Sequence, residues 1–253
     1  MKSAESSLPE QFQDHFEIGI AQTRRELEHV FRVRGDVYCR EFQYERAEDC
    51  PGGLEIDRYD YRAVHCLITH RRSGHPAGCV RLVLAGEAES DPRLPFEVVC
   101  GDRVRHPLLH PQCLPTATVC EISRLAVHTL FRRRPGEARN PLGDYEEFKP
   151  TPKEIRTFPL LSVALFLAAT GMVELSGRHH VYAIMEPRLA RLLLRSGLAF
   201  QQVGEVVEYH GARAAYHISI DRALEGIRSQ LCDFYELVAS NVRLTKTETQ
   251  AAH

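Results

Sequence analysis

Charged residues inside an apolar strand are the feature that most constrains how this chain can fold. The segment Thr118–Val127, TVCEISRLAV, has the β-branched and apolar content of a strand, yet it carries Glu121 and Arg124. A charge buried in a strand is costly unless it meets an opposite charge. The fold must therefore bring other charged segments to this strand.

Alternation along the strand predicts which of its side chains share a face. Successive residues of an extended strand point to opposite sides, so Glu121 and Ser123 fall on one face and Ile122 and Arg124 on the other. A β-bulge within the segment would change this assignment. The relative placement of Glu121 and Arg124 therefore depends on whether the strand is regular.

Three further segments combine charges with apolar positions and supply candidate partners. Arg81 lies in the apolar run GCVRLV, and Asp57 and Asp60 of the segment EIDRYD are its expected counter-ions. The third segment, RGDVY, begins at Arg34. Because charges in such strands need partners, we expect these residues to gather in one cluster.

The order of periodic segments and breakers predicts a mixed α/β (α+β) fold, with helices against a largely antiparallel central sheet. Two long loop excursions are predicted at residues 86–116 and 131–153. The expected elements are a helix at 17–34, a loop at 45–60, a hairpin of Ala63–Thr69 and Cys79–Ala85, the strand Thr118–Val127, a helix at Ile155–Ser176, a strand at Val181–Met185, a helix at Pro187–Ser196, strands at Val203–Tyr209 and Ala214–Ile220, and a helix at Ala223–Val242.

The length of 253 residues allows one large domain. We expect that domain at residues 15–242, with a disordered N-terminus at 1–14 and a disordered tail at 243–253. The longest apolar stretch, Phe158–Val173, is interrupted by polar residues and is short for a bilayer. It therefore predicts a buried helix, and no transmembrane segment is expected.

Composition indicates which kinds of binding partner and which cellular compartment to expect. The formal net charge is −2, so a nucleic-acid partner is not expected. The polar N-terminus lacks the apolar core of a signal peptide. The eight cysteines form no CxxC pair, and Cys66, Cys79 and Cys120 lie in apolar runs. This usage predicts small buried thiols in a reducing, cytoplasmic setting.

The charged segments resemble those of a known enzyme family in kind and in order. RGDVYCREFQYE, EIDRYD, GCVRLV and EISRLAV follow one another as in the acyl-homoserine-lactone synthases and the long-chain N-acyl amino acid synthases, both of the GNAT acyltransferase superfamily. The chain most resembles the acyltransferases associated with the PEP-CTERM/exosortase system. The resemblance covers about residues 15–220 and implies a GNAT-like fold.

The resemblance also implies a set of site residues. Tyr44 stands where the lactone synthases typically have Trp, Tyr38 occupies the Phe position, and the chain contains no Trp. These departures weaken the case for S-adenosylmethionine and a lactone product. The implied catalytic residues are Glu121, Arg124 and Arg81, and the implied substrate-binding residues are Arg34, Tyr38, Tyr44, Asp57 and Asp60.

The implied chemistry is direct acyl transfer from a thioester to an amine, with no enzyme nucleophile. Glu121 is the candidate base that takes the amine proton. By analogy with GNAT enzymes, backbone N–H groups at 124–127 would stabilise the oxyanion. An amino-acid acceptor brings a carboxylate that Arg34 or Arg124 could bind. The thioester arm is expected where the strand of Glu121 diverges from the strand at 181–185.

Each of these assignments has an alternative that the residues leave open. The arginines and aspartates can form a purely structural ion-pair network, and Glu121 can orient the arginines instead of acting as a base. The tyrosines can serve as pocket walls instead of proton donors.

The donor is inferred from residues 131–139, FRRRPGEAR. A loop that cradles the pyrophosphate of coenzyme A is Gly-rich, whereas this run has one Gly with a Pro and a Glu. Acyl carrier protein is therefore the expected donor in preference to acyl-CoA, with Arg132, Arg133 and Arg134 docking its acidic surface. The alternative is a solvated basic loop.

Three functions are considered on the basis of the sequence and the resemblance. The first is an N-acyltransferase that moves a fatty acyl group from acyl carrier protein to an amino-acid-like amine. The second is an acyl-homoserine-lactone synthase that uses S-adenosylmethionine, and the third is a non-catalytic module that binds an acyl chain or carrier protein. No tightly bound cofactor is expected, and no metal, because His106, His110 and Cys113 have no fourth ligand in view.

Overall fold

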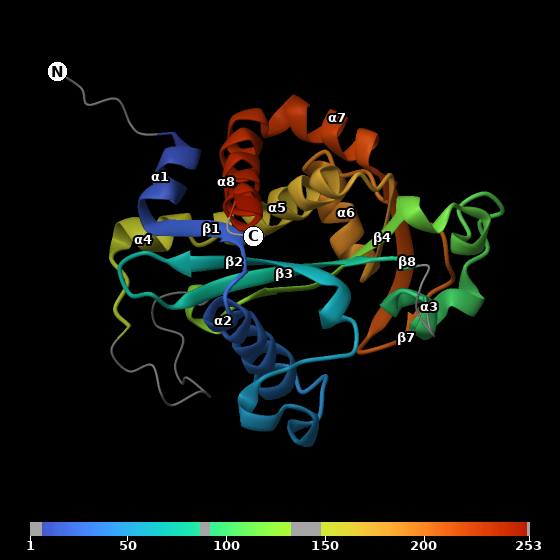
Figure 1. Cartoon of the computed structure of the whole chain (residues 1–253), viewed down its shortest axis with the longest axis horizontal. Helices are drawn as coiled ribbons and strands as arrows, with labels where there is room; N and C mark the ends of the chain where they lie inside the picture. Colours follow the sequence, from blue (N-terminus) through green and yellow to red (C-terminus); the bar gives the residue numbers. More distant parts are fainter. Residues whose placement is uncertain (1–6, 87–91, 133–147, 252–253) are drawn as a thin grey trace.

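A mixed sheet with helices on both faces forms the centre of the molecule (Figure 1). The computed structural model describes residues 7–86, 92–132 and 148–251. The predicted largely antiparallel α/β architecture is confirmed. The strands are β1 (Phe16–Ile20), β2 (Ala63–His70), β3 (Pro76–Leu84), β4 (Val119–Val127), β5 (His180–Met185), β6 (Gln201–Gln202), β7 (Val207–Glu208) and β8 (Ala212–Ser219).

The helices frame this sheet and include a short one, α3, within the excursion predicted at 86–116. The α-helices are α1 (Leu8–His15), α2 (Arg24–Arg34), α3 (Pro95–Cys100), α4 (Pro152–Thr157), α5 (Leu160–Ser176), α6 (Pro187–Arg195), α7 (Ile220–Gln230) and α8 (Cys232–Ala251). A π-helical segment, Gly35–Glu41, continues directly from α2.

β4 and β5 run parallel in a sheet whose other described pairs are antiparallel. The strand order is β1-β2-β3-β4-β5-β8-β6, and β7 pairs with β8. β4 pairs with β5 only over Val119–Glu121, which face His180–Tyr182. Beyond Glu121, β4 keeps its partner β3 but has no partner residue on β5. The two strands therefore diverge, as predicted, and the divergence begins at Glu121.

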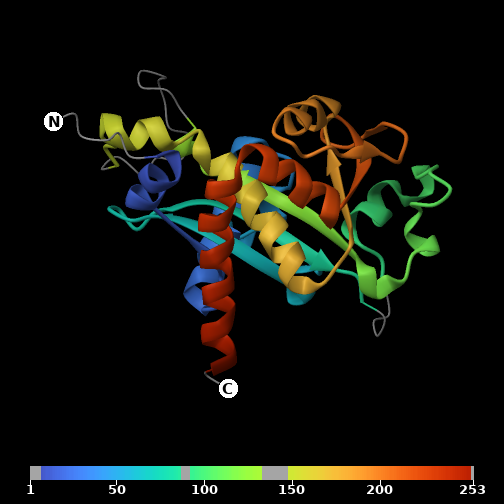
Figure 2. The same cartoon turned by 90° about the horizontal axis from the view of Figure 1, so that it is seen from above.

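The two faces of the sheet carry different cores. Seen from above, α5 and α8 lie over the sheet (Figure 2), and Leu165 of α5 belongs to the largest apolar cluster with Leu82 of β3. On the opposite face, α2 contributes Val33 to one smaller cluster and α3 contributes Phe96 to another. Because side chains alternate along β3, Arg81 points to this second face, between the two smaller clusters.

Three expected helices differ in extent from those observed. Residues 17–20 of the helix expected at 17–34 instead belong to β1, which pairs along β2, and α2 begins after its N-cap residue Thr23, which forms a capping box with Glu26. Pro159 separates α4 from α5, because proline has no N–H to continue the first helix. The last expected helix is two helices, and α7 already begins at Ile220.

Both ends of the described chain are more helical than predicted. α1 lies within the expected disordered N-terminus, where Ser7 and Glu10 form a capping box and Phe12 is buried against Phe16 and Phe234. α8 continues through the expected tail to Ala251. Phe12 on α1 and Val238 and Val242 on α8 are buried, and this packing stabilises the helical segments that carry them. None of the helices in the described ranges has the length and apolar content needed to cross a membrane.

The cysteines are only partly as predicted. Cys66, Cys79 and Cys120 are buried free thiols, in agreement with the apolar runs that contain them. A disulfide joins Cys39 and Cys50, however, so the expectation of reduced thiols is wrong for this pair. The π-helical segment and the turns at 47–53 fold back on each other, which brings together two cysteines that no CxxC pattern marks.

Candidate active site

A buried ion-pair network occupies the second face of the sheet, between α2 and α3. Arg34 donates from Nη1 and Nη2 to Asp60, at 2.7 and 3.1 Å, and from Nε to Glu55. Arg81 Nη1 donates to Asp57 at 2.6 Å and to Asp60 at 2.8 Å. Both arginines are 0% exposed. The predicted charge cluster is therefore present, with the predicted counter-ions of Arg81.

The charges of this network are stabilised by their mutual contacts. Burial opposes the charged form of Asp60, but the hydrogen bonds and charge of Arg34 outweigh it and lower the pKa of Asp60 to about 2. In the same way, the pKa of Glu55 is lowered despite its burial, by Arg34 and Arg124. All three nitrogens of the Arg34 guanidinium are engaged in this network. Arg34 therefore has no free nitrogen for a substrate carboxylate.

A close approach between two backbone segments carries the acidic loop to α2. A Cβ on Gly35 would lie 2.1 Å from the carbonyl oxygen of Gly53, so no larger residue fits there without movement. Immediately afterwards, Glu55 N–H donates to the carbonyl of Phe31 at 3.1 Å. These contacts fix the start of the segment that holds the carboxylates of the network.

A β-bulge in β4 reorients Arg124. Arg81 pairs with Ser123 and Cys79 with Ala126, so β4 has one more residue than β3 between these pairs. Arg124 has a φ of 50°, a left-handed conformation that costs a residue with a side chain about 1–3 kcal/mol. Regular alternation is therefore wrong at this position, and the bulge turns Arg124 toward the ion-pair network.

Arg124 lies at the edge of that network and is partly accessible to solvent. Its Nη2 donates to Glu55 at 3.1 Å and to Glu45 at 3.2 Å, and lies 3.5 Å from a carboxylate oxygen of Asp57. Its guanidinium lies 5.5 Å from the ring centroid of Tyr38. The side chain of Arg124 is 20% exposed, unlike the fully buried arginines behind it.

Glu121 is a buried carboxyl group with a strongly shifted pKa. It is 2% exposed, and its Oε2 accepts a hydrogen bond from the N–H of Phe96 at 2.8 Å. Burial raises the pKa of Glu121 to about 8, and the Phe96 hydrogen bond and the charges of Arg81 and Arg124 offset only part of this effect. The group therefore exchanges its proton near neutral pH, where an acid–base catalyst is most effective.

The two tyrosines have the contacts of pocket walls. The hydroxyl of Tyr38 donates to the carbonyl of Leu125 at 2.9 Å, and burial raises the pKa of Tyr38 to about 12. Tyr44 stacks between Phe42 and His210, with ring centroids at 5.3 and 4.7 Å. These contacts favour the wall role over the donor role.

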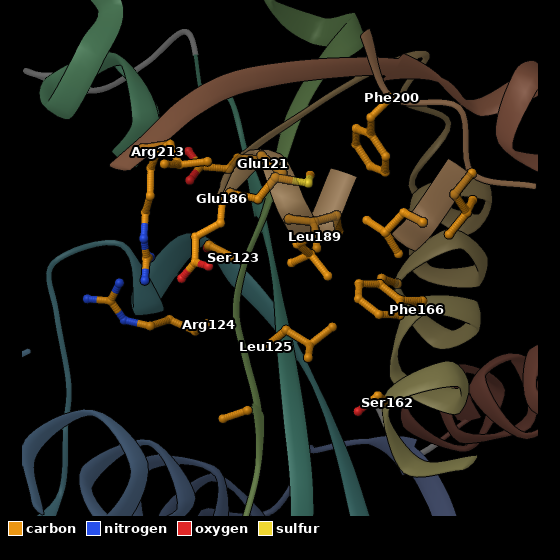
Figure 3. A pocket seen from close by; sticks show the side chains of 18 of the residues that line it. Glu121, Ser123, Arg124, Leu125, Ser162, Phe166, Glu186, Leu189, Phe200 and Arg213 are labelled. Carbon is orange, nitrogen blue, oxygen red and sulfur yellow. The ribbon is translucent and has the colours of Figure 1, made fainter. Parts of the chain in front are cut away.

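A pocket of about 620 Å³ opens where β4 and β5 diverge. Figure 3 shows most of its labelled polar side chains on one side of β4 and its labelled apolar side chains on the other, where Ser162 of α5 is the polar exception. One side carries the polar residues Glu121, Ser123, Arg124, Glu186 and Arg213, and the other carries Leu125, Phe166, Leu189 and Phe200. We call these the polar half and the apolar half.

The site residues expected from the sequence form two groups, those that line the pocket and those that do not. Tyr38, Tyr44, Glu121 and Arg124 line it. The remaining four lie behind its wall, in the ion-pair network: Arg34, Asp57, Asp60 and Arg81.

The expected docking residues can be placed only in part. Arg132 lines the pocket, donates to Glu41 and to the carbonyl of Val127, and lies 5.4 Å from the ring centroid of Phe42. Its guanidinium is thus largely engaged within the chain. Arg133 and Arg134 lie outside the described residues.

Glu55 and Arg213 are among the residues of this site that sequence reasoning missed. Glu55 opens the EIDRYD segment and bridges Arg34 to Arg124, but its role depends on the β4 bulge. Arg213 begins the apolar run of β8, so the same argument about charges in strands could have found it. Within the part of the chain that the structure describes, no three His, Cys, Asp or Glu side chains gather as a metal site.

Comparisons with known proteins bear on the fold of this chain. Residues 33–139 match the model of a GNAT acetyltransferase domain. No curated protein sequence matches the chain. The expected GNAT-like fold is confirmed.

Solved structures with similar folds include three synthases. The acyl-homoserine-lactone synthase LasI is 17% identical, with a TM-score of 0.54 over 81% of this chain and 90% of its own. BjaI, a CoA-dependent acyl-homoserine-lactone synthase solved with S-adenosylmethionine and isopentyl-CoA, is 20% identical, with a TM-score of 0.54 over 85% and 88%. FeeM, an N-acyl amino acid synthase from uncultured soil microbes, is 13% identical, with a TM-score of 0.51 over 86% and 96%. At these identities the likeness concerns the fold.

Proposed function

We propose that this chain is an N-acyltransferase that moves a long fatty acyl group from an acyl-carrier-protein thioester to the amine of an amino acid or similar small molecule. The observation that carries the proposal is Glu121, a buried carboxyl group with a pKa of about 8, in the polar half of a pocket whose other half is apolar. Similarity in fold to synthases of acyl-homoserine lactones and N-acyl amino acids supports acyl transfer.

The apolar half suits the acyl chain. Phe166 of α5, Leu189 of α6 and Phe200 present apolar surface to it (Figure 3). The pocket volume of about 620 Å³ lies within the range of small-molecule sites, about 300–1,000 Å³. Burying each methylene of a chain contributes about 0.8 kcal/mol, so a long chain would bind well here.

The polar half suits the reacting groups. The amine nitrogen bonds to the thioester carbonyl carbon, its proton passes to the Glu121 carboxylate directly or through water, and the thiol leaves after taking up a proton. Backbone N–H groups at 124–127, where β4 has no β5 partner, would stabilise the oxyanion. Because no covalent enzyme intermediate forms, no side-chain nucleophile is needed.

The ion-pair network supports this chemistry indirectly. Arg81 and Arg34 are 0% exposed and do not line the pocket, so we assign them as positioning residues. Arg34 pairs with Glu55, and Arg81 pairs with Asp57 and Asp60. Glu55 in turn pairs with Arg124. The proposal thus combines the structural and the catalytic interpretations of these residues, because a structural ion-pair network orients Arg124 at the pocket wall.

The choice of carrier protein as donor rests on the sequence of the 131–139 run, which lacks a Gly-rich phosphate cradle. Arg132 stands at the pocket, but its contact with Glu41 leaves it less available than the sequence suggests. In this proposal the acidic surface of the carrier meets the basic run Arg132–Arg134.

A second candidate is an acyl-homoserine-lactone synthase that uses S-adenosylmethionine. The similarity in fold to BjaI, which was solved with that compound, favours it. Tyr44 at the position where those synthases typically have Trp disfavours it. A non-catalytic acyl-binding module would not need Glu121 and Arg124 in the pocket wall.

Product analysis by mass spectrometry separates these functions. The purified protein is incubated with long-chain acyl carrier protein and a pool of amino acids, with and without S-adenosylmethionine. An acylated amino acid formed without S-adenosylmethionine supports the proposal and names the acceptor. A lactone formed only in its presence supports the second candidate. Donor binding without any turnover favours the binding module.

Two broader assignments belong to the same proposal. The order of the motifs supports an association with the PEP-CTERM/exosortase system, which the genes neighbouring this one would test. A cytoplasmic location fits a carrier-protein donor, and cell fractionation would test it.

A further inference from the structure

Unlike Arg34, Arg81, Arg124 and Arg132, Arg213 has no carboxylate partner among the described residues. Its Nε is buried without a hydrogen-bond partner, and its guanidinium lies 5.3 Å from the ring centroid of Tyr44. Arg124, by contrast, contacts Glu45, Glu55 and a third carboxylate. A guanidinium with unused donors at a pocket wall is suited to bind an anion.

The fold directs Arg213 into the polar half. It lies on β8, where it pairs with Val207 of β7, and it lines the pocket. Figure 3 shows its side chain extending from β8 toward Arg124, on the same side of β4 as Glu121. Two positive groups that approach each other repel, and an anion between them would relieve the repulsion. Contact with the Tyr44 ring restricts the orientation of the planar Arg213 guanidinium, and this favours a planar anion.

We propose that Arg213 binds the carboxylate of the acceptor, so that the enzyme selects α-amino acids over amines and amides that lack this charge. The inference rests on the proposed N-acyltransferase function and assigns the carboxylate to a residue other than Arg34 or Arg124. Arg34 is fully engaged, and Arg124 already binds three carboxylates.

The position of Arg213 favours the acceptor over the donor as the source of the anion. The acyl chain of the donor belongs in the apolar half, across β4 from Arg213 and Glu121 (Figure 3). In an α-amino acid, one carbon separates the amine from the carboxylate. A carboxylate held at Arg213 therefore keeps the amine in the polar half, where Glu121 can take its proton.

The test compares each amino acid with its α-carboxamide as acceptor, with long-chain acyl carrier protein as donor. Wild-type protein is expected to prefer the acid. Arg213→Gln should raise the KM for the acid about 10- to 100-fold, change kcat little and abolish the preference. Arg213→Lys keeps the charge without the fork and should retain part of the preference. Arg228→Gln, an exposed arginine of α7 outside the pocket, is the matched control and should behave as wild type.

Several outcomes would overturn the inference. A preference for the acid that survives in Arg213→Gln, with an unchanged melting temperature, would exclude Arg213 as the carboxylate site. A rise in the KM of the donor in place of the acceptor would assign Arg213 to the phosphate of the carrier arm. Equal acylation of acids and amides by wild-type protein would refute the inference but leave the N-acyltransferase function intact. If wild-type protein acylates none of these amines, the proposed function fails, and the Arg213 inference fails with it.

Discussion

The raised pKa of Glu121 leads to a prediction about stability that does not require a substrate. The native state holds the proton of Glu121 up to a pH of about 8, whereas an ordinary Glu releases it near 4.5. Between these values the native state binds more protons than the unfolded state, so the free energy of unfolding falls as pH rises. Each pH unit in this window costs the native state about 1.4 kcal/mol, with a ceiling of roughly 5 kcal/mol above pH 8.

Glu121→Gln removes this dependence. Its side-chain carbonyl can still accept from the Phe96 N–H, and it is uncharged, like the protonated Glu121. The variant should match wild type near pH 4 and become more stable than wild type by about 1.4 kcal/mol per pH unit between about pH 5.5 and 7.5. Urea titrations at several pH values measure this difference, and Glu225→Gln, at an exposed position on α7, is the matched control.

The same variant tests catalysis. If Glu121 is the base, wild-type kcat should rise with pH through about 8 as the carboxylate forms, and Glu121→Gln should lose about 100- to 10,000-fold of kcat together with this pH step. A stability difference that stays flat with pH would refute the raised pKa. Full activity in the variant would remove Glu121 from the base role while leaving the stability result valid.

Three further predictions concern the network, the pocket and the disulfide loop. Asp60→Asn leaves two buried arginines short of a counter-ion, so the free energy of unfolding should fall by about 3–5 kcal/mol in urea titration; a loss below about 1 kcal/mol would mean that the network is hydrated. Phe166→Trp adds bulk to the apolar half and should shift products toward shorter acyl chains by mass spectrometry, whereas an unchanged profile would place the chain elsewhere. A dithiol reductant, or Cys39→Ser with Cys50→Ser, should speed amide hydrogen exchange across residues 40–49, and unchanged exchange would show that packing alone orders this loop.

A prediction at the carrier surface tests the donor assignment. Changing Arg132, Arg133 and Arg134 together to Ala should weaken binding of acyl carrier protein and reduce its salt dependence, because these charges are expected to meet an acidic surface. Surface plasmon resonance at two ionic strengths measures both effects. Unchanged binding would leave the run as solvated surface.

The sequence by itself determined the sheet and the charged cluster. The hairpin of β2 and β3 and the β4 strand follow from apolar periodicity and segment order, whereas the divergence of β4 from β5 was implied by the resemblance to GNAT enzymes. The pairing of Arg81 with Asp57 and Asp60 follows from the cost of leaving charges unpaired in apolar strands. Periodicity was less informative at helix ends and at β1, because strand pairing with β2 overrides the helical pattern predicted for residues 17–20.

Only the tertiary structure decided which charges reach the pocket. One bulge residue, Arg124, changes the face on which a guanidinium lies, and alternation cannot foresee a bulge. The separation of buried Arg34 and Arg81 from pocket-lining Arg124 and Arg213 depends on which elements cover each side chain. Local sequence specifies which residues carry charge, but burial and partners are set by segments far apart in the chain. Those long-range contacts determine which charged group holds the structure together and which one can meet a substrate.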